Sequence, residues 1–363
     1  MLTKIEISRS ALRNNILQIK NFLPKTTKFM AVIKANAYGH GLFEVVNSIK
    51  NNIDYLATFH FEDAILMRKK GIKKPILVLG RIFKEQIDEA IKYDIIASVS
   101  TLDILKIKKP LRCHICVDTG LGRDGFTQNQ MQEVINLSKK SQLKIEGLYA
   151  HFAAADDFLE NNYTQNQIEK LLIWRNEFNK INLKLLTHHQ ASAGAISGKI
   201  NNDFNIARIG MSLYGCYPSS DLAKVAAKLK LQPVLTWKTK ISELRELKKG
   251  EKISYNCTYQ LRRDSKLATL PIGYFDGFSR NSSNNSFVLI NGKKCQQLGR
   301  VTMNLIVVDV TDLKNVKIGD EVVLIGKQKS EEILADTFGY FAKTSCYEAL
   351  TRLNSAINRI LVK

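Results

Sequence analysis

Short apolar segments rich in β-branched residues alternate with helical patterns through the first 210 residues of this chain. Eight such segments lie at 29–35, 55–59, 76–80, 95–100, 113–118, 147–152, 185–190 and 205–210. Helical patterns lie before and between them, at 10–22, 42–51, 62–70, 84–92, 128–140 and 161–180. A strand followed by a helix, repeated, is typical of a parallel sheet with crossover helices. Eight units predict an α/β fold, a closed (β/α)8 barrel of the TIM type, with an open doubly wound sheet as the alternative.

The sequence pattern changes after about residue 225. Short strand-like segments follow at 235–244, 266–271, 286–290, 293–298, 305–310 and 321–326, separated by Asn-Gly, Gly-Asp and Ser-Asn turns. Helical patterns return at 330–342 and 347–353. A chain of 363 residues is long enough for about two domains. We therefore expect the barrel over residues 1–229 and a mainly β domain over residues 230–363.

The chain is strongly basic, with 54 Lys and Arg against 34 Asp and Glu, a formal net charge of +20. The lysines are scattered in short pairs along the whole chain, and no nucleic-acid-binding motif accompanies them. We therefore expect a solvated basic surface and no nucleic-acid partner.

Six cysteines are thinly spread, unlike those of a disulfide-rich secreted protein. Cys113 and Cys116 would point to opposite faces of a strand, so we expect neither a bridge nor a metal site there.

The first residues, Met1 to Arg13, show no apolar core and no cleavage pattern of a secretory signal. The most apolar stretch, Leu148 to Ala155, is far shorter than the roughly 18 residues of a membrane span. These features predict a soluble, cytoplasmic protein without membrane association.

Polar residues and glycines stand at one end of the apolar strands, where barrel enzymes place their catalytic groups. Lys34 ends the first strand, so it is a candidate for a lowered pKa and imine chemistry. A lysine that extends to solvent at the barrel rim is the alternative. Glycines and small hydroxyl side chains follow the seventh and eighth strands, where barrels often bind phosphate through backbone N–H groups.

The segment from Ala31 to Gly41, AVIKANAYGHG, resembles the pyridoxal-phosphate lysine motif of alanine racemases. Further blocks resemble that family in the same order along nearly the whole chain: VDTGLGR at 117–123, YAHF at 149–152, SAG at 192–194, ARIGMSLYG at 207–215, ISYN at 253–256, PIGYFDG at 271–277, GRVTM at 299–303 and CYE at 346–348. The resemblance implies a (β/α)8 barrel with a C-terminal β domain, pyridoxal 5′-phosphate as cofactor and a head-to-tail homodimer with shared active sites.

The resemblance also assigns roles by position. It makes Lys34 the lysine of the internal aldimine and Tyr255 the opposing base, supplied by the β domain of the partner subunit. It matches Arg208 to the arginine that faces the pyridine nitrogen, and His151 to the histidine between that arginine and the tyrosine. The remaining matches are Tyr38, Ser192, Gly210, Met211 and Tyr347 at the cofactor phosphate, Arg123 and the backbone N–H of Met303 at the substrate carboxylate, and Tyr274, Arg280, Asp156 and Arg300 in the substrate entrance corridor.

Racemisation needs a base on each face of a planar carbon, and Lys34 and Tyr255 meet that need. A tyrosine with an ordinary pKa of about 10 is a poor base at neutral pH, so cationic groups such as Arg208 acting through His151 are expected beside it. The implied activity is alanine racemisation, which supplies D-alanine for peptidoglycan. The alternatives are a serine or broader racemase and a non-catalytic carrier of the cofactor. Arg208 argues against a decarboxylase, which would want an acidic partner for the ring nitrogen.

Two positions depart from the family pattern. Cys116 stands where the family usually has a lysine that is often carbamylated, and Asn304 stands where an aspartate often follows the methionine. Both departures remove negative charge near the site. We expect Arg123 to be partly buried and to lack its charged partner, and a bound anion such as chloride to replace that partner. A nearby side chain, such as His114 or Asn304, and a water-filled gap are the alternatives.

Overall fold

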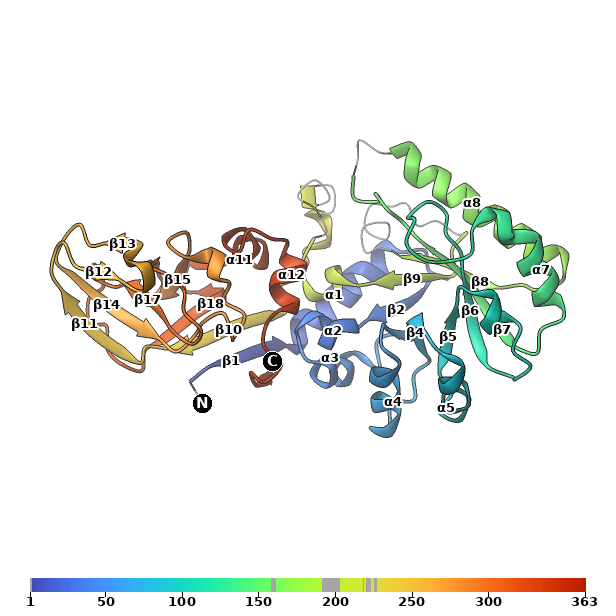
Figure 1. The fold of residues 1–363 in the computed structure, drawn as a ribbon, viewed down its shortest axis with the longest axis horizontal. Coiled ribbons are helices and arrows are strands. Elements are labelled where there is room, and N and C mark those ends of the chain that lie inside the picture. Colours follow the sequence, from blue (N-terminus) through green and yellow to red (C-terminus); the bar gives the residue numbers. More distant parts are fainter. Residues whose placement is uncertain (1, 158–160, 191–202, 218, 220–222, 225–226) are drawn as a thin grey trace. The chain divides into compact units, whose positions relative to one another are not determined.

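The structure, a computed structural model, describes residues 2–157, 161–190, 203–217, 219, 223–224 and 227–363 (Figure 1). The chain divides into two compact units. The barrel unit comprises Leu12–Ala35 and Val46–Gln232, and the sheet unit comprises Met1–Ala11, Asn36–Val45 and Pro233–Lys363.

Eight parallel strands form a closed barrel in the order of the sequence. They are β2 (Lys28–Val32), β3 (Tyr55–Thr58), β4 (Ile76–Arg81), β5 (Ile96–Val99), β6 (Arg112–Cys116), β7 (Lys144–His151), β8 (Leu186–Gln190) and β9 (Ile206–Ile209). The first and last strands pair to close the barrel, with Met30 opposite Arg208. The predicted barrel is thus confirmed, and the open sheet is excluded.

The helices of the N-terminal half lie between successive strands. They are α1 (Arg9–Phe22), α2 (Lys34–Tyr38), α3 (Leu42–Ile49), α4 (Phe61–Lys69), α5 (Ile87–Lys92), α6 (Leu102–Leu105), α7 (Met131–Lys139) and α8 (Asn161–Lys180). Helix α4 packs on β3 and β4, and α8 packs on β7. The longest helix, α8, buries Ile168, Leu171, Trp174 and Phe178, whose spacing of three or four residues places them on one face.

The sheet unit is built around a mainly antiparallel sheet in the order β11-β14-β17-β16-β15-β18-β10-β1-β20, with β19 paired to β18. These strands are β1 (Lys4–Ser8), β10 (Leu235–Lys240), β11 (Glu243–Leu247), β14 (Ser265–Leu270), β15 (Phe287–Ile290), β16 (Lys293–Leu298), β17 (Ile306–Asp309), β18 (Glu321–Gln328), β19 (Glu331–Ile333) and β20 (Arg359–Val362). A hairpin of β12 (Lys252–Ile253) and β13 (Tyr259–Gln260) is separate. Helices α11 (Ala335–Phe341) and α12 (Cys346–Thr351) complete the unit. Its core contains Trp237, Phe278 and Phe338, with ring centroids 5.5 to 6.4 Å apart.

Two element predictions for the second half differ from the structure, and one strand near the N-terminus was not predicted. The predicted strand at 235–244 is two strands, because the chain changes partners between β10, which pairs with β1 and β18, and β11, which pairs with β14. The predicted helix at 330–342 begins only at Ala335, after β19. Strand β1, not expected at all, pairs antiparallel with β10 and parallel with β20.

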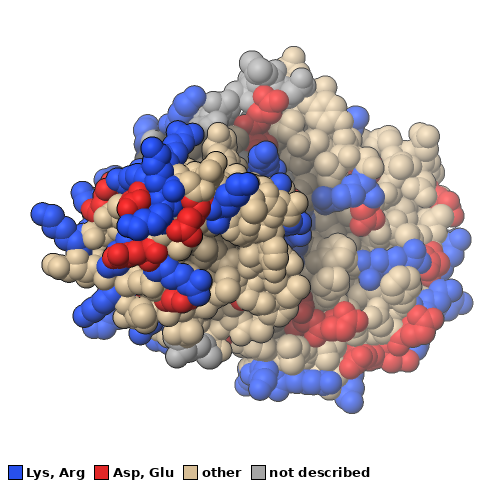
Figure 2. All heavy atoms as spheres, turned by 60° about the vertical axis from the view of Figure 1, so that its left-hand side comes forward, with Lys and Arg blue, Asp and Glu red and all other residues tan. Residues whose placement is uncertain are grey.

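Lysine and arginine side chains are scattered over the face seen in Figure 2, with aspartate and glutamate between them. Across the residues that the structure describes, no helix is long and apolar enough to span a bilayer.

Candidate active site

A cavity of about 480 Å³ lies in the barrel unit, and the carboxyl ends of several barrel strands contribute to its lining. The lining includes Lys34, Cys116, Arg123, Tyr149, His151 and Arg208. Barrel enzymes carry their active sites at this end of the strands. Four residues singled out in the sequence, Lys34, Arg123, His151 and Arg208, are thus brought together here.

Lys34 is half-buried and begins α2 directly after β2 and Ile33. Its pKa is lowered, first by burial and then by the positive charges of Arg123 and Arg208. A lowered pKa increases the share of neutral amine, which is the nucleophilic and basic form. The lysine therefore has the environment that imine chemistry requires.

The backbone after Lys34 is left-handed over four consecutive residues. The φ angles of Ala35, Asn36, Ala37 and Tyr38 are 53°, 53°, 53° and 54°. L-residues disfavour this region by roughly 1–2 kcal/mol each. Strain of this kind clusters at functional sites, where the surroundings hold it. The residue types alone gave no indication of this turn, because alanine and tyrosine ordinarily take right-handed or extended conformations.

Arg208 is a buried cation, 1% exposed, at the end of β9. Its Nη2 donates to the carbonyl oxygen of Ala150 at 2.6 Å, and its guanidinium carbon lies 4.4 Å from the ring centre of Tyr149. Within the described residues, its Nε and Nη1 have no hydrogen-bond partner. Burial lowers the pKa of Arg208 to about 10, so the side chain stays charged at neutral pH. It can therefore donate hydrogen bonds to an acceptor placed in the cavity.

A buried stack of polar side chains supports Arg208 from inside the barrel. The ring of Tyr149 stacks on His188, with centroids 5.0 Å apart, and its hydroxyl hydrogen-bonds Ser98. Nδ1 of His114 lies 2.8 Å from Nε2 of His188. Burial, together with the charges of Arg208 and Arg112, lowers the pKa of His114 to about 3. No local pattern in the sequence indicates this stack, because its members come from four different strands.

Arg123 differs from the expectation of a partly buried side chain, since it is exposed in the single chain. Its Nη2 lies 3.1 Å from Nδ1 of His151. Cys116 is buried at the end of β6, and burial raises the pKa of its thiol to about 12, so this group is neutral. The acidic residues of the cavity lining are Asp118 and Asp124, and Asp118 accepts hydrogen bonds from the N–H groups of two loop glycines.

The residues matched to the cofactor phosphate fall in several segments. Tyr38 and Tyr347 lie together in the sheet unit, with ring centroids 6.5 Å apart at an interplanar angle of 63°. Burial raises the pKa of Tyr38 further above its usual value, so the hydroxyl remains a donor. Gly210 and Met211 lie at the end of β9, where the 3-10 helix Met211–Tyr214 begins. Ser192 lies outside the described residues.

Tyr255 is 68% exposed and begins a short 3-10 turn in the sheet unit. Its neighbours Ser254 and Asn256 have φ angles of 62° and 60°, so the backbone around it is also left-handed. The hydroxyl of Ser254 donates to the carbonyl oxygen of Arg300 at 2.7 Å. Met303 is 53% exposed, and its carbonyl oxygen accepts from a backbone N–H of the loop at 273–277.

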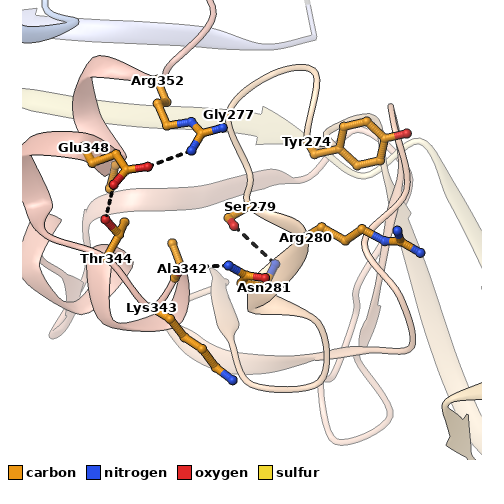
Figure 3. Close-up of a pocket in the computed structure, with 11 residues that line it drawn as sticks. Tyr274, Gly277, Ser279, Arg280, Asn281, Ala342, Lys343, Thr344, Glu348 and Arg352 are labelled. Atoms are coloured by element: carbon orange, nitrogen blue, oxygen red, sulfur yellow. Dashed lines mark hydrogen bonds and ion pairs between the residues drawn. The ribbon is translucent and has the colours of Figure 1, made fainter.

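Tyr274 and Arg280 line a second cavity, of about 550 Å³, in the sheet unit (Figure 3). Both side chains extend to the same side, away from the ion pair of Glu348 and Arg352. The other two residues matched to the entrance corridor lie elsewhere. Arg300 follows β16 near the Tyr255 turn, and Asp156 lies in the barrel unit, where its carbonyl oxygen accepts from Ser219.

Comparison with known proteins shows which family this chain resembles. The N-terminal domain model of alanine racemases matches residues 7–218, and the C-terminal domain model matches residues 234–361. An alanine racemase of Halothermothrix orenii is 38% identical, with 98% of this chain and 96% of the relative covered. Alanine racemase 2 of Caldanaerobacter subterraneus subsp. tengcongensis is 34% identical, with 99% of this chain and 95% of the relative covered.

Solved structures agree with the family matches. An alanine racemase of Clostridium difficile 630 superposes with a TM-score of 0.92 at 33% identity, covering 100% of this chain and 96% of that one. An alanine racemase of Bacillus anthracis with bound L-Ala-P gives a TM-score of 0.91 at 31% identity, covering 99% and 95%. The resemblance noted in the sequence is confirmed: this chain belongs to the alanine racemase family.

Proposed function

We propose that this chain interconverts L-alanine and D-alanine in the cytoplasm, with pyridoxal 5′-phosphate as cofactor, and so supplies D-alanine for peptidoglycan. One observation carries the proposal. A half-buried lysine shares a cavity with a buried arginine, two of whose donor nitrogens have no partner in the described part of the chain. The relatives reported above carry the name alanine racemase.

The residues of the cavity fit the cofactor. The amine of Lys34 can condense with an aldehyde. The donors of Arg208 need an acceptor, and a pyridine nitrogen without a proton is one. Because arginine keeps its proton, this contact favours an unprotonated ring. When bound, the cofactor withdraws electron density from the α-carbon of an amino acid and so weakens its C–H bond.

Lys34 and Tyr255 divide the proton transfers between them. With the cofactor bound, the free amine of Lys34 would remove or return the α-proton on one face of the substrate. Tyr255 does the same on the opposite face. A proton removed on one face and returned on the other inverts the configuration, and this is racemisation.

The two bases belong to different units of the chain, Lys34 to the barrel unit and Tyr255 to the sheet unit. We assign residues 1–229 to a barrel domain that carries the cofactor lysine, and residues 230–363 to a β domain that supplies Tyr255 to the partner subunit of a homodimer. The exposure of Tyr255 and Met303 in the single chain supports this assignment, because both are accessible to a second subunit.

The other matched residues bind and admit the ligands. We assign the cofactor phosphate to Tyr38, Ser192, Gly210, Met211 and Tyr347, the substrate carboxylate to Arg123 and the N–H of Met303, and the entrance corridor to Tyr274, Arg280, Asp156 and Arg300. We assign His151 to the link between Arg208 and Tyr255; in the single chain its Nδ1 lies 3.1 Å from Nη2 of Arg123.

A chloride ion near Arg123 is part of the proposal. Lys34, Arg81, Arg123 and Arg208 line the cavity, against Asp118 and Asp124. The thiol of Cys116 adds no negative charge, because burial keeps it protonated. An excess of positive charge in a confined space attracts a small anion.

The proposal is tested by incubating the purified protein and pyridoxal phosphate with each of a panel of L-amino acids, serine included, and measuring the D-enantiomer formed. We expect D-alanine to form fastest. A preference for serine would identify a serine racemase, and cofactor binding without any D-amino acid would identify a carrier. Lys34→Ala should form no D-alanine, whereas replacement of the exposed Lys249 by Ala should leave the rate unchanged.

A further inference from the structure

The left-handed turn after Lys34 needs support from the rest of the fold. Four successive residues take this conformation, which L-residues disfavour, and Tyr38 is the last of them. Such strain persists only where the surrounding contacts determine the backbone. The contacts that hold this turn are therefore also the contacts that place Tyr38.

Some of these contacts come from the turn and the residues that follow it. Nδ1 of His40 lies 3.1 Å from the carbonyl oxygen of Ala37 and 3.0 Å from that of Tyr38. Burial lowers the pKa of His40 to about 4, so it is a neutral ring that donates from Nδ1. The side-chain oxygen of Asn36 accepts from the N–H of Leu42 at 2.8 Å.

Another set of contacts comes from Arg359, which begins the last strand of the chain. Its Nε and Nη2 donate to the carbonyl oxygen of Gly39 at 3.2 and 3.0 Å. Its Nη1 donates to Asn354 and Ile357, both at 2.6 Å, and its Nη2 also donates to Leu353 at 3.2 Å. An arginine has five N–H donors, and these five bonds use all of them. Arg359 therefore has no donor left for a ligand, and its hydrogen bonds go to backbone carbonyls.

The same side chain connects the turn to α12. Gly39 has a φ of 84°, and a Cβ there would lie 2.1 Å from the carbonyl oxygen of Leu350, so the turn packs directly on this helix. Leu353, which Arg359 also holds, lies just beyond the end of α12. Helix α12 carries Tyr347, whose ring lies beside that of Tyr38.

We infer that Arg359 is a positioning residue for the cofactor phosphate. By holding the carbonyl of Gly39 and the end of α12 together, it fixes the spacing of the Tyr38 and Tyr347 hydroxyls, without touching the ligand. This inference rests on the proposed function, in which both tyrosines bind the phosphate. Its consequence is specific: loss of Arg359 weakens the binding of the phosphate group and leaves the binding of the aldehyde ring largely unchanged.

The test compares two aldehydes that differ only in the phosphate. The cofactor-free protein is titrated with pyridoxal phosphate and with pyridoxal, and the ratio of the two dissociation constants is measured. We expect Arg359→Met to reduce the preference for the phosphate form by about tenfold or more, while pyridoxal affinity changes by less than about threefold. The control is Arg263→Met, which removes an exposed arginine of the same unit paired with Asp312 and should keep the wild-type ratio.

A double-mutant cycle tests whether Arg359 acts through Tyr38. Tyr38→Phe should reduce the phosphate preference, and adding Arg359→Met should reduce it by much less than in the wild type. An unchanged ratio in Arg359→Met, an equal loss of both affinities, or fully additive effects would each overturn the inference. If Arg359→Met does not fold, Arg359→Lys is used in the same titrations, because one ammonium group cannot hydrogen-bond to all four carbonyl oxygens. A wild type with no affinity for either aldehyde would instead refute the proposed function.

Discussion

The barrel should lose stability in mild acid because of one buried histidine. His114 is fully buried, and its Nδ1 shares a hydrogen bond with His188. A Cβ at Gly147 would lie 2.6 Å from its ring, so the site has no spare room. Burial, with the charges of Arg208 and Arg112, lowers the pKa of His114 from 6.5 to about 3. The folded barrel therefore keeps this ring neutral at a pH where the unfolded chain protonates it.

The direction and size of the effect follow from proton linkage. Above pH 6.5 the ring is neutral in both states, so His114 adds no pH dependence. As the pH falls from 6.5 to about 3, only the unfolded chain binds the proton, and the free energy of unfolding falls. The limiting slope is about 1.4 kcal/mol per pH unit. Between pH 6.5 and about 4.5 the loss is on the order of 2 to 3 kcal/mol at most.

Urea unfolding between about pH 7.5 and about pH 4.5 measures this slope. The replacement His114→Gln keeps a polar partner for His188 but removes the titration. Its free energy of unfolding should depend on pH less steeply than that of the wild type. The difference in slope should be at most that of one bound proton, about 1.4 kcal/mol per pH unit. His60→Gln, which replaces an exposed histidine of the same unit, should keep the wild-type slope. An identical pH dependence in His114→Gln and the wild type would refute the reasoning.

Three further predictions concern the site. Gly39→Ala should destabilise the protein by about 2 kcal/mol or more in thermal unfolding, because its Cβ would lie 2.1 Å from a backbone oxygen of α12. Tyr149→Leu should weaken cofactor binding to the cofactor-free protein by up to about 30-fold, because Arg208 loses a cation–π contact of about 2 kcal/mol, whereas Tyr149→Phe should bind as the wild type. Removal of chloride should lower racemase activity, and Cys116→Lys in bicarbonate should reduce this dependence. Equal rates with and without chloride would contradict an anion near Arg123.

The barrel could be predicted from the sequence because its signals are local. Each strand is a run of apolar residues, and a segment such as 161–180 shows its helical period without reference to the rest of the fold. Strand β1 could not be predicted in this way. Its partners, β10 and β20, lie more than 220 residues away, and nothing in residues 4–8 indicates that pairing.

In the candidate site, too, the residues within local motifs could be predicted, and the contacts that depend on the fold could not. Lys34, Arg123, His151 and Arg208 were found because each stands at a strand end within a recognisable motif. The support beneath them was not found, because it depends on packing between strands. Nothing local in the sequence indicates that His114 meets His188 from β8. The left-handed turn was missed for a similar reason, since distant contacts such as those of Arg359 impose it on ordinary residues.

The two-base assignment is tested most directly by hydrogen exchange at the α-carbon of alanine in D2O, followed by proton NMR for each enantiomer separately. With the wild type, both L-alanine and D-alanine should exchange the α-proton and racemise. Tyr255→Phe keeps the ring but removes the hydroxyl, so it should still exchange one enantiomer, through Lys34, without racemising it. Racemisation by Tyr255→Phe at the wild-type rate, or no exchange of either enantiomer by the wild type, would contradict the account.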